Sequence, residues 1–263
     1  MATLAGFSGK SNQERQAYLA ERLFPEAGLT DITLQRVYYD GGWGEEYGNW
    51  DGLHNVIGWR RGSLPEQQRR RIVVGAHYDK VTYPWRSATP GHSDGILDNG
   101  TGAALLARLA REVAPPKHDL VVVGFATEEP PPFFAGSTTY FGALSPEERD
   151  AVLAYVNLDV LGRGELAMVM NSSPPLAAVA LARAASGGLG LTWRAVSLDV
   201  NSDHLPALSY GIPVLALTST DYDGRHIHAP EDRLSAVDPA AYARHYATIR
   251  AILEALDQHF AGP

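Results

Sequence analysis

Residues 71–80 read RIVVGAHYDK, an apolar run that stops at a histidine and an aspartate. The run holds three consecutive β-branched side chains and has no charge after Arg71, which is typical of a strand buried on both faces. A second such run, LVVVGFA at residues 120–126, is followed closely by Glu128 and Glu129. In both places, polar groups capable of chemistry follow a predicted buried strand.

Helices are predicted between these strands. A capping-box sequence, Ser11-Asn12-Gln13-Glu14, predicts a helix that runs to about Leu23. We expect further helices over 101–114, after Ser145, over 174–186 and after Asp238, and further strands over 155–160 and 213–218. This alternation predicts an α/β fold, with three α/β/α layers around a mixed, mostly parallel central sheet. A length of 263 residues fits a single domain over residues 1–263.

The composition narrows the classes of function. A formal net charge of −8 argues against a nucleic-acid partner, because phosphate binding needs clustered Lys and Arg. The chain has no cysteine, so any metal ligands must be His, Asp or Glu. The N-terminus lacks a signal-peptide pattern, and no apolar run reaches the ~18 residues of a membrane helix. We therefore expect a cytoplasmic protein with no membrane partner, although a removed leader would leave the same pattern.

Ligand-type side chains gather at the predicted strand ends, where ligands bind in such sheets. The candidates are His77, Asp98, Glu128, Glu129, Asp159, His226 and His228. Each motif alone has an ordinary explanation; Asp98-Asn99-Gly100, for example, is a turn that can cap a helix. Together they predict a cation site, because carboxylates buried in one crevice need a counter-charge. Two His and three carboxylates suit zinc, with manganese or cobalt as substitutes.

Six segments together resemble a known family. They are GAHYDK (75–80), LDNGTGAALL (97–106), FATEEPP (125–131), NLDVLG (157–162), SDHLPALSYGIPVL (202–215) and HAPEDRLSAVD (228–238). The combination resembles the co-catalytic zinc aminopeptidases, metallopeptidase family twenty-eight, whose relatives include leucyl aminopeptidase, plasma glutamate carboxypeptidase and glutaminyl cyclase. The resemblance implies the zinc-exopeptidase fold, of the phosphorylase/hydrolase-like kind. It also implies two zinc ions and a peptide substrate with a free N-terminus.

The resemblance also implies a role for each residue. His77, Asp98, Glu129, Asp159 and His228 are similar to the metal ligands, with Asp98 as the bridge between two metals. Glu128 is similar to the general base, and Asp79 to the residue that orients the ring of His77. His226 competes with His228, and His92 or Asp94 is a weaker candidate for an approach to a metal. Residues 197–201 lack the oxyanion-stabilising tyrosine of some members, which leaves the metal, His204 or Tyr210.

Three other functions stay open at this stage. A cyclase-like acyltransferase would use one zinc and attack by an internal amine. A carboxypeptidase or dipeptidase would need a cation such as Arg163 or Arg225 to hold a carboxylate. A binding module without catalysis would be expected to lose ligands, and the sequence retains all of them. For an aminopeptidase, Phe133 and Phe134 are candidates for the wall of an apolar pocket.

Overall fold

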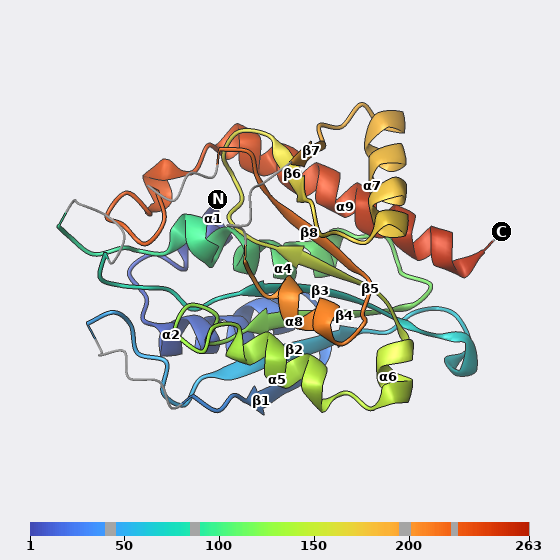
Figure 1. Ribbon diagram of the computed structural model, residues 1–263, viewed down its shortest axis with the longest axis horizontal. Helices are drawn as coiled ribbons and strands as arrows, with labels where there is room; N and C mark the ends of the chain where they lie inside the picture. Colours follow the sequence, from blue (N-terminus) through green and yellow to red (C-terminus); the bar gives the residue numbers. More distant parts are fainter. Residues whose placement is uncertain (40–45, 85–89, 195–200, 222–225, 263) are drawn as a thin grey trace.

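In the computed structural model, which describes residues 1–39, 46–84, 90–194, 201–221 and 226–262, helices cover both faces of one sheet (Figure 1). The described strands form an eight-stranded sheet in the order β1-β2-β4-β3-β5-β8-β6-β7. Neighbours β4, β3, β5 and β8 run parallel, whereas β2 and β6 pair antiparallel on either side of them. The predicted three-layer, mixed α/β fold is therefore confirmed.

The elements have the following bounds. The strands are β1 Thr30–Arg36, β2 His54–Arg60, β3 Arg71–His77, β4 Asp119–Phe125, β5 Val152–Leu158, β6 Leu166–Val169, β7 Thr192–Arg194 and β8 Val214–Ser219. The helices are α1 Ala2–Ala5, α2 Asn12–Ala17, α3 Phe24–Glu26, α4 Thr101–Glu112, α5 Ala135–Ala143, α6 Pro146–Asp150, α7 Pro174–Ser186, α8 His204–Ser209 and α9 Pro239–Ala261. Short helical turns are η1 Tyr18–Leu23, η2 Glu66–Gln68, η3 Ile96–Gly100 and η4 Leu234–Ala236.

The central strands of the sheet are buried because their side chains pack into two cores, one on each face. Val74 and Val122 belong to the core that includes α4, α7 and α9, whereas Val73 and Val121 belong to the core that includes α5 and α8. Successive side chains of a strand point to opposite faces, so a strand that is covered on both sides must be apolar throughout. All seven residues of β4 are buried. The continuous apolar runs of β3 and β4 thus follow from their central places in the sheet.

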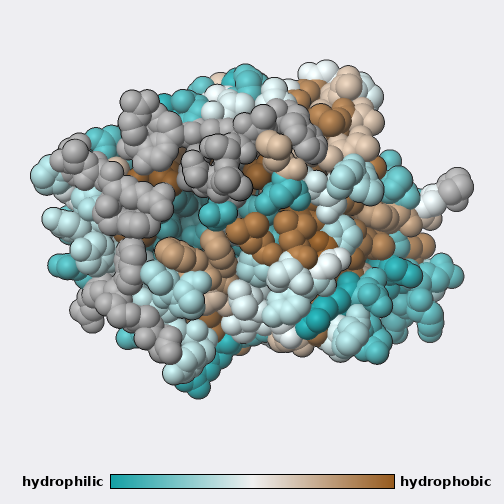
Figure 2. Space-filling view, in the orientation of Figure 1, coloured by the Kyte–Doolittle hydropathy of each residue, from teal (hydrophilic) through white to brown (hydrophobic). Residues whose placement is uncertain are grey.

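The surface combines polar and apolar patches. In the view of Figure 2, apolar side chains gather near the middle of the visible face, and polar residues surround them. The exposed large apolar residues include Leu34, Tyr38, Tyr83, Phe133, Met170 and Leu181. None of the described helices is both long and apolar enough to cross a membrane.

Candidate metal centre

Three ligand-type residues meet where β3 and β5 end. His77 is the last residue of β3, and Asp159 directly follows β5, its parallel neighbour. Asp98 joins them from the irregular turn η3 that precedes α4. The Nε2 atom of His77 lies 3.1 Å from Oδ1 of Asp98 and 3.3 Å from Oδ1 of Asp159. The sheet topology therefore brings together three residues that are far apart in the sequence.

A second group of three forms on the other side of Asp98. Nε2 of His228 lies 3.0 Å from Oδ2 of Asp98 and 2.7 Å from Oε2 of Glu129. Glu129 lies shortly beyond the end of β4, and His228 lies in the loop beyond β8. The ligand atoms of this group lie within 4.8 Å of one another, as do those of His77, Asp98 and Asp159. Asp98 thus presents one oxygen to each group, which is the arrangement of a carboxylate that bridges two metals.

The donor set fits divalent cations. Both histidines and all three carboxylates are buried, with exposures of 8% or less. Within the described residues, Nε2 of His77 and Oδ1 of Asp159 are buried atoms that make no hydrogen bond. Such atoms cost free energy unless a partner satisfies them, and imidazole with carboxylate oxygen is a zinc-type ligand set. A divalent cation held by His77, Asp98 and Asp159 would satisfy both atoms.

The electrostatics of these groups also favour a bound cation. Burial lowers the pKa of His228, but Glu129 and Asp98 outweigh it and raise that pKa to about 10. Burial also lowers the pKa of His77, but nearby carboxylates, Glu128 foremost, raise it well above its ordinary value. Burial raises the pKa of Glu129 to about 7. The carboxylates that raise the pKa of both histidines create a negative field, which would also attract a metal cation.

Glu128 lies beside the candidate ligands but belongs to neither of the two groups that share Asp98. Its carboxylate belongs to a cluster with His77 and Glu129 whose ligand atoms lie within 4.8 Å of one another. Burial raises the pKa of Glu128 well above its ordinary value, while His77 opposes the shift and Glu129 adds to it. A carboxylate of raised pKa is suited to accept and return a proton near neutral pH.

The comparisons with known proteins agree with this geometry. A model of peptidase family M28 matches residues 55–253. The chain belongs to peptidase family M28. It is 27% identical over 205 residues to a probable leucine aminopeptidase of Arthroderma benhamiae, a match that covers 70% of this chain and 54% of that protein. It is 32% identical over 111 residues to an aminopeptidase of Pseudomonas aeruginosa, covering 41% of this chain and 18% of that protein.

Solved structures of M28-like fold extend the comparison. A zinc aminopeptidase from Bacillus subtilis superposes with a TM-score of 0.65 at 23% identity, covering 76% of this chain and 49% of that one. A glutaminyl cyclase from an Acidobacteriales bacterium superposes with a TM-score of 0.76 at 20% identity, covering 98% and 92%. Because both identities are low, these superpositions show a shared fold alone. The M28 chain spans about half or less of the curated relatives' length.

Asp79 contacts the ring of His77, as expected, but its carboxylate makes closer contacts elsewhere. Its Oδ1 lies 3.6 Å from Nδ1 of His77, whereas the backbone carbonyl of Asp79 is nearer, at 3.2 Å. The carboxylate instead accepts hydrogen bonds from the backbone N–H groups of Glu128, at 3.1 Å, and Glu129, at 3.2 Å. The indole Nε1 of Trp50 donates a third, at 2.8 Å. Asp79 therefore holds the Glu128–Glu129 backbone, and Trp50 is a partner that sequence reasoning missed.

A second residue that sequence reasoning missed supports the backbone of Asp98, the candidate bridging ligand. The buried carboxylate of Asp232 accepts hydrogen bonds from the N–H groups of Leu97, at 2.6 Å, and Asp98, at 3.3 Å. The only sequence signal was its place in the segment HAPED, four residues after His228. Its contacts are with backbone atoms, whose positions appear only once the chain has folded.

The other sequence candidates lie outside the two groups. His92 stacks edge-on against Tyr83, and Asp94 contacts Ser8, Gly9 and Lys80. Tyr210 packs under the guanidinium of Arg149. The described His226 belongs to none of the metal-type groups found in the described chain. Residues 197–200 of the stretch that lacks the tyrosine lie outside the described residues.

His204 remains a candidate hydrogen-bond donor whose ring is neutral. It is fully buried, and its Nε2 lies 2.9 Å from Nδ2 of Asn171. Burial lowers the pKa of His204 to about 4. The ring is therefore neutral at physiological pH, with Nε2 accepting from Asn171 and the proton on Nδ1.

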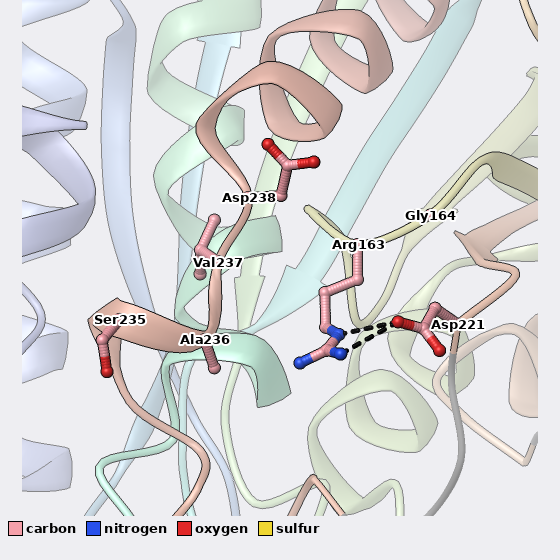
Figure 3. Close-up of a pocket in the computed structure, with 7 residues that line it drawn as sticks. All are labelled: Arg163, Gly164, Asp221, Ser235, Ala236, Val237 and Asp238. Atoms are coloured by element: carbon pink, nitrogen blue, oxygen red, sulfur yellow. Dashed lines mark hydrogen bonds and ion pairs between the residues drawn. The ribbon is translucent and has the colours of Figure 1, made fainter.

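The described structure does not support the arginines that were considered as anchors for a substrate carboxylate. Arg163 lines a cavity of about 360 Å³, where its guanidinium faces Asp221 (Figure 3). Nε and Nη2 of Arg163 lie 3.0 and 2.9 Å from Oδ2 of Asp221, so its charge is already paired. Arg225 lies outside the described residues.

Proposed function

We propose that this M28 chain is a zinc-dependent aminopeptidase that hydrolyses the N-terminal peptide bond of peptides. One observation carries the proposal: two groups of ligands share Asp98, with His77 and Asp159 on one side and His228 and Glu129 on the other. A shared carboxylate between two sites is what a paired-metal hydrolase requires. The family match supports the peptidase class.

Glu128 supplies the proton transfers. When bound, the two cations would lower the pKa of a shared water and polarise the scissile carbonyl. Glu128 accepts the proton of the attacking water and then delivers it to the leaving amine. Asp79 holds the backbone of Glu128 by accepting a hydrogen bond from its N–H at 3.1 Å. The Glu128 carboxylate belongs to neither of the two groups that share Asp98, which leaves it available for proton transfer.

The substrate is a peptide with a free amino terminus. The cluster of carboxylates would attract an amine that is partly cationic at neutral pH. Phe133 and Phe134 follow Glu129 and three prolines, and their ring centroids lie 6.1 Å apart. Phe133 is 39% exposed, so it offers apolar surface to a ligand four residues after Glu129. We propose that leucine, methionine or phenylalanine is preferred at the first position over aspartate or glutamate.

A glutaminyl cyclase activity is the second candidate. The observation that favours it is the TM-score of 0.76 to a cyclase that covers 98% of this chain and 92% of that one. In a cyclase with one zinc, the α-amine of an N-terminal glutamine would attack the carbonyl of its own side-chain amide, and ammonia would leave. The two ligand groups around Asp98 favour hydrolysis instead.

One assay separates these activities. A leucyl peptide, its N-acetylated form and a glutaminyl peptide are compared at equal concentration with zinc-loaded protein. We expect rapid release of leucine, kcat/KM at least about 100-fold lower for the acetylated peptide because the amine contact is lost, and no cyclised product. Equal kcat/KM for the free and acetylated peptides would rule out an aminopeptidase. Cyclised product with no leucine release would establish the second candidate.

A further inference from the structure

Two buried polar side chains of helix α2 bind the chain that leaves β3. Asn12 is 2% exposed and Arg15 is 0% exposed. The Oδ1 atom of Asn12 accepts from the N–H of Lys80 at 2.9 Å, and its Nδ2 donates to the carbonyl of Lys80 at 3.3 Å. One side chain thus pairs with both backbone groups of the residue that follows Asp79.

Arg15 reaches further, to two separate parts of the candidate metal centre. Its Nη1 donates to the carbonyl of Tyr78 at 3.2 Å and to the carbonyl of Gly95 at 3.0 Å. Its Nη2 donates to the carbonyls of Asp94 and Phe7. Tyr78 directly follows His77, and residues 94–95 lead into Asp98. A single guanidinium therefore ties the backbone beside one predicted ligand to the backbone that leads into another.

The segment that carries Asp98 is held from a second side. Asp232, fully buried, accepts from the N–H groups of Leu97 and Asp98, while Arg15 binds carbonyls at the start of the same segment. Together the two side chains fix residues 94–98 at both ends. In this held conformation, Oδ1 of Asp98 faces His77 and Oδ2 faces His228.

Burying a guanidinium on carbonyl oxygens is costly for the fold. Burial lowers the pKa of Arg15 to about 10, and Asp94 and Asp232 oppose the shift. The residue stays charged at neutral pH, so the chain carries a desolvated cation beneath the site. An apolar side chain at this position would leave the carbonyls of Tyr78, Gly95, Asp94 and Phe7 without this donor. The guanidinium therefore fixes these backbone segments relative to one another.

We propose that Arg15, assisted by Asn12, is a positioning residue of the metal centre. It sets the separation between the backbone that carries His77 and the segment that carries Asp98, and thereby the metal affinity. Both residues precede the region matched by the family model, residues 55–253. The inference rests on the metal centre of the proposed function.

Zinc affinity of folded protein tests this inference without any measurement of activity. We would compare Arg15→Lys, Asn12→Ala and the control Arg60→Lys by competition with a chromophoric chelator, and confirm folding by circular dichroism. Arg60 is a matched control, because its Nη1 also donates to two carbonyls, those of Ala110 and Val113 at 2.7 and 2.8 Å. Arg60 pairs with Leu120 at the start of β4. It therefore lies at the end of the strands opposite to the one that carries the candidate ligands.

We expect Arg15→Lys to weaken binding of at least one zinc by about 10–100-fold and Asn12→Ala by about tenfold, the range for residues that orient ligands. Arg60→Lys should bind zinc as the parent does. Parent-like affinity in Arg15→Lys and Asn12→Ala, or an equal loss in Arg60→Lys, would overturn the inference and leave the proposed function intact. If Arg15→Lys does not fold, Asn12→Ala decides between the same outcomes. A parent chain that binds no zinc would overturn both proposals.

Discussion

At the scale of single residues, Glu128 and Glu129 offer the sharpest contrast, because they are neighbours with different proposed roles. Glu129 contacts His228 at 2.7 Å within a ligand group, whereas Glu128 lies outside the two groups that share Asp98. We expect Glu128→Gln to keep its metal and to lower kcat by roughly 10²–10⁴, the usual contribution of a positioned base. The matched variant Glu129→Gln should lose metal. Metal content and kcat of both variants check this, and the opposite pattern would exchange the two roles.

The hydrogen bonds of Asp79 lead to a second prediction. Asn in its place keeps one acceptor but turns an amide donor toward the N–H groups of Glu128 and Glu129 or toward Trp50. We expect Asp79→Asn to lower kcat/KM by about 10–100-fold while the protein stays folded. Steady-state kinetics beside thermal unfolding would check it. Parent-like kinetics would mean that these hydrogen bonds do not position Glu128.

The buried His204 predicts a pH dependence of stability. Its pKa is lowered from 6.5 to about 4 in the folded protein, so between those values the unfolded chain binds more protons. Stability from this group is present above pH 6.5 and is lost as the pH falls toward 4. From pH 7 to pH 5 the loss is about 2 kcal/mol. Urea unfolding of His204→Gln at both pH values should show a correspondingly smaller drop than the parent, and an identical drop would contradict the account.

Whether a site residue could be predicted from the sequence depends on what it contacts. His77, Glu129 and Asp159 follow apolar strands, so the alternating pattern alone places them at one edge. Trp50, Asp232 and Arg15 instead bind a side chain or backbone atoms far away in the sequence, and their local surroundings give no sign of it. Such supporting contacts exist only once the sheet has brought the distant segments together.

At the scale of elements, local signals succeeded where they were strong. The capping box predicted at Ser11 is present, and α7 has the predicted bounds Pro174–Ser186. A helix begins after Ser145 as predicted, and the structure shows that it too has a capping box. β5 ends at Leu158, so Asp159 lies just after the strand rather than within it. β1 was missed because most of it is exposed and its pattern is not apolar. α5, AGSTTYFGA, was missed because it lacks helical periodicity.

The capping box of α6 predicts a purely structural effect. The hydroxyl of Ser145 accepts from the N–H of Glu148, whose carboxylate accepts in turn from the N–H of Ser145. Ser145→Ala should lower the free energy of unfolding by about 1 kcal/mol and leave kcat/KM unchanged. Ser186→Ala, which removes an exposed hydroxyl at the end of α7, is the control. Urea unfolding is the measurement, and equal effects of the two changes would count against the cap.

At the scale of the whole molecule, the fold class could be predicted because alternating strands and helices allow few arrangements. The order of the strands could not, since β2, β4 and β3 are neighbours although they are separated in sequence. That order decides which residues meet. It places β3 beside both β4 and β5, so the ends that carry His77, Glu128 and Asp159 converge.

The paired site is the central claim, and the number of metal ions per chain tests it most directly. Metal analysis would be done on protein purified without chelator and equilibrated with zinc, together with activity during stepwise reloading of chelator-treated protein. We predict two equivalents of zinc per chain and full activity only when both are bound, because His77 with Asp159 and His228 with Glu129 each need a cation at Asp98. One equivalent of zinc with full activity would contradict the account.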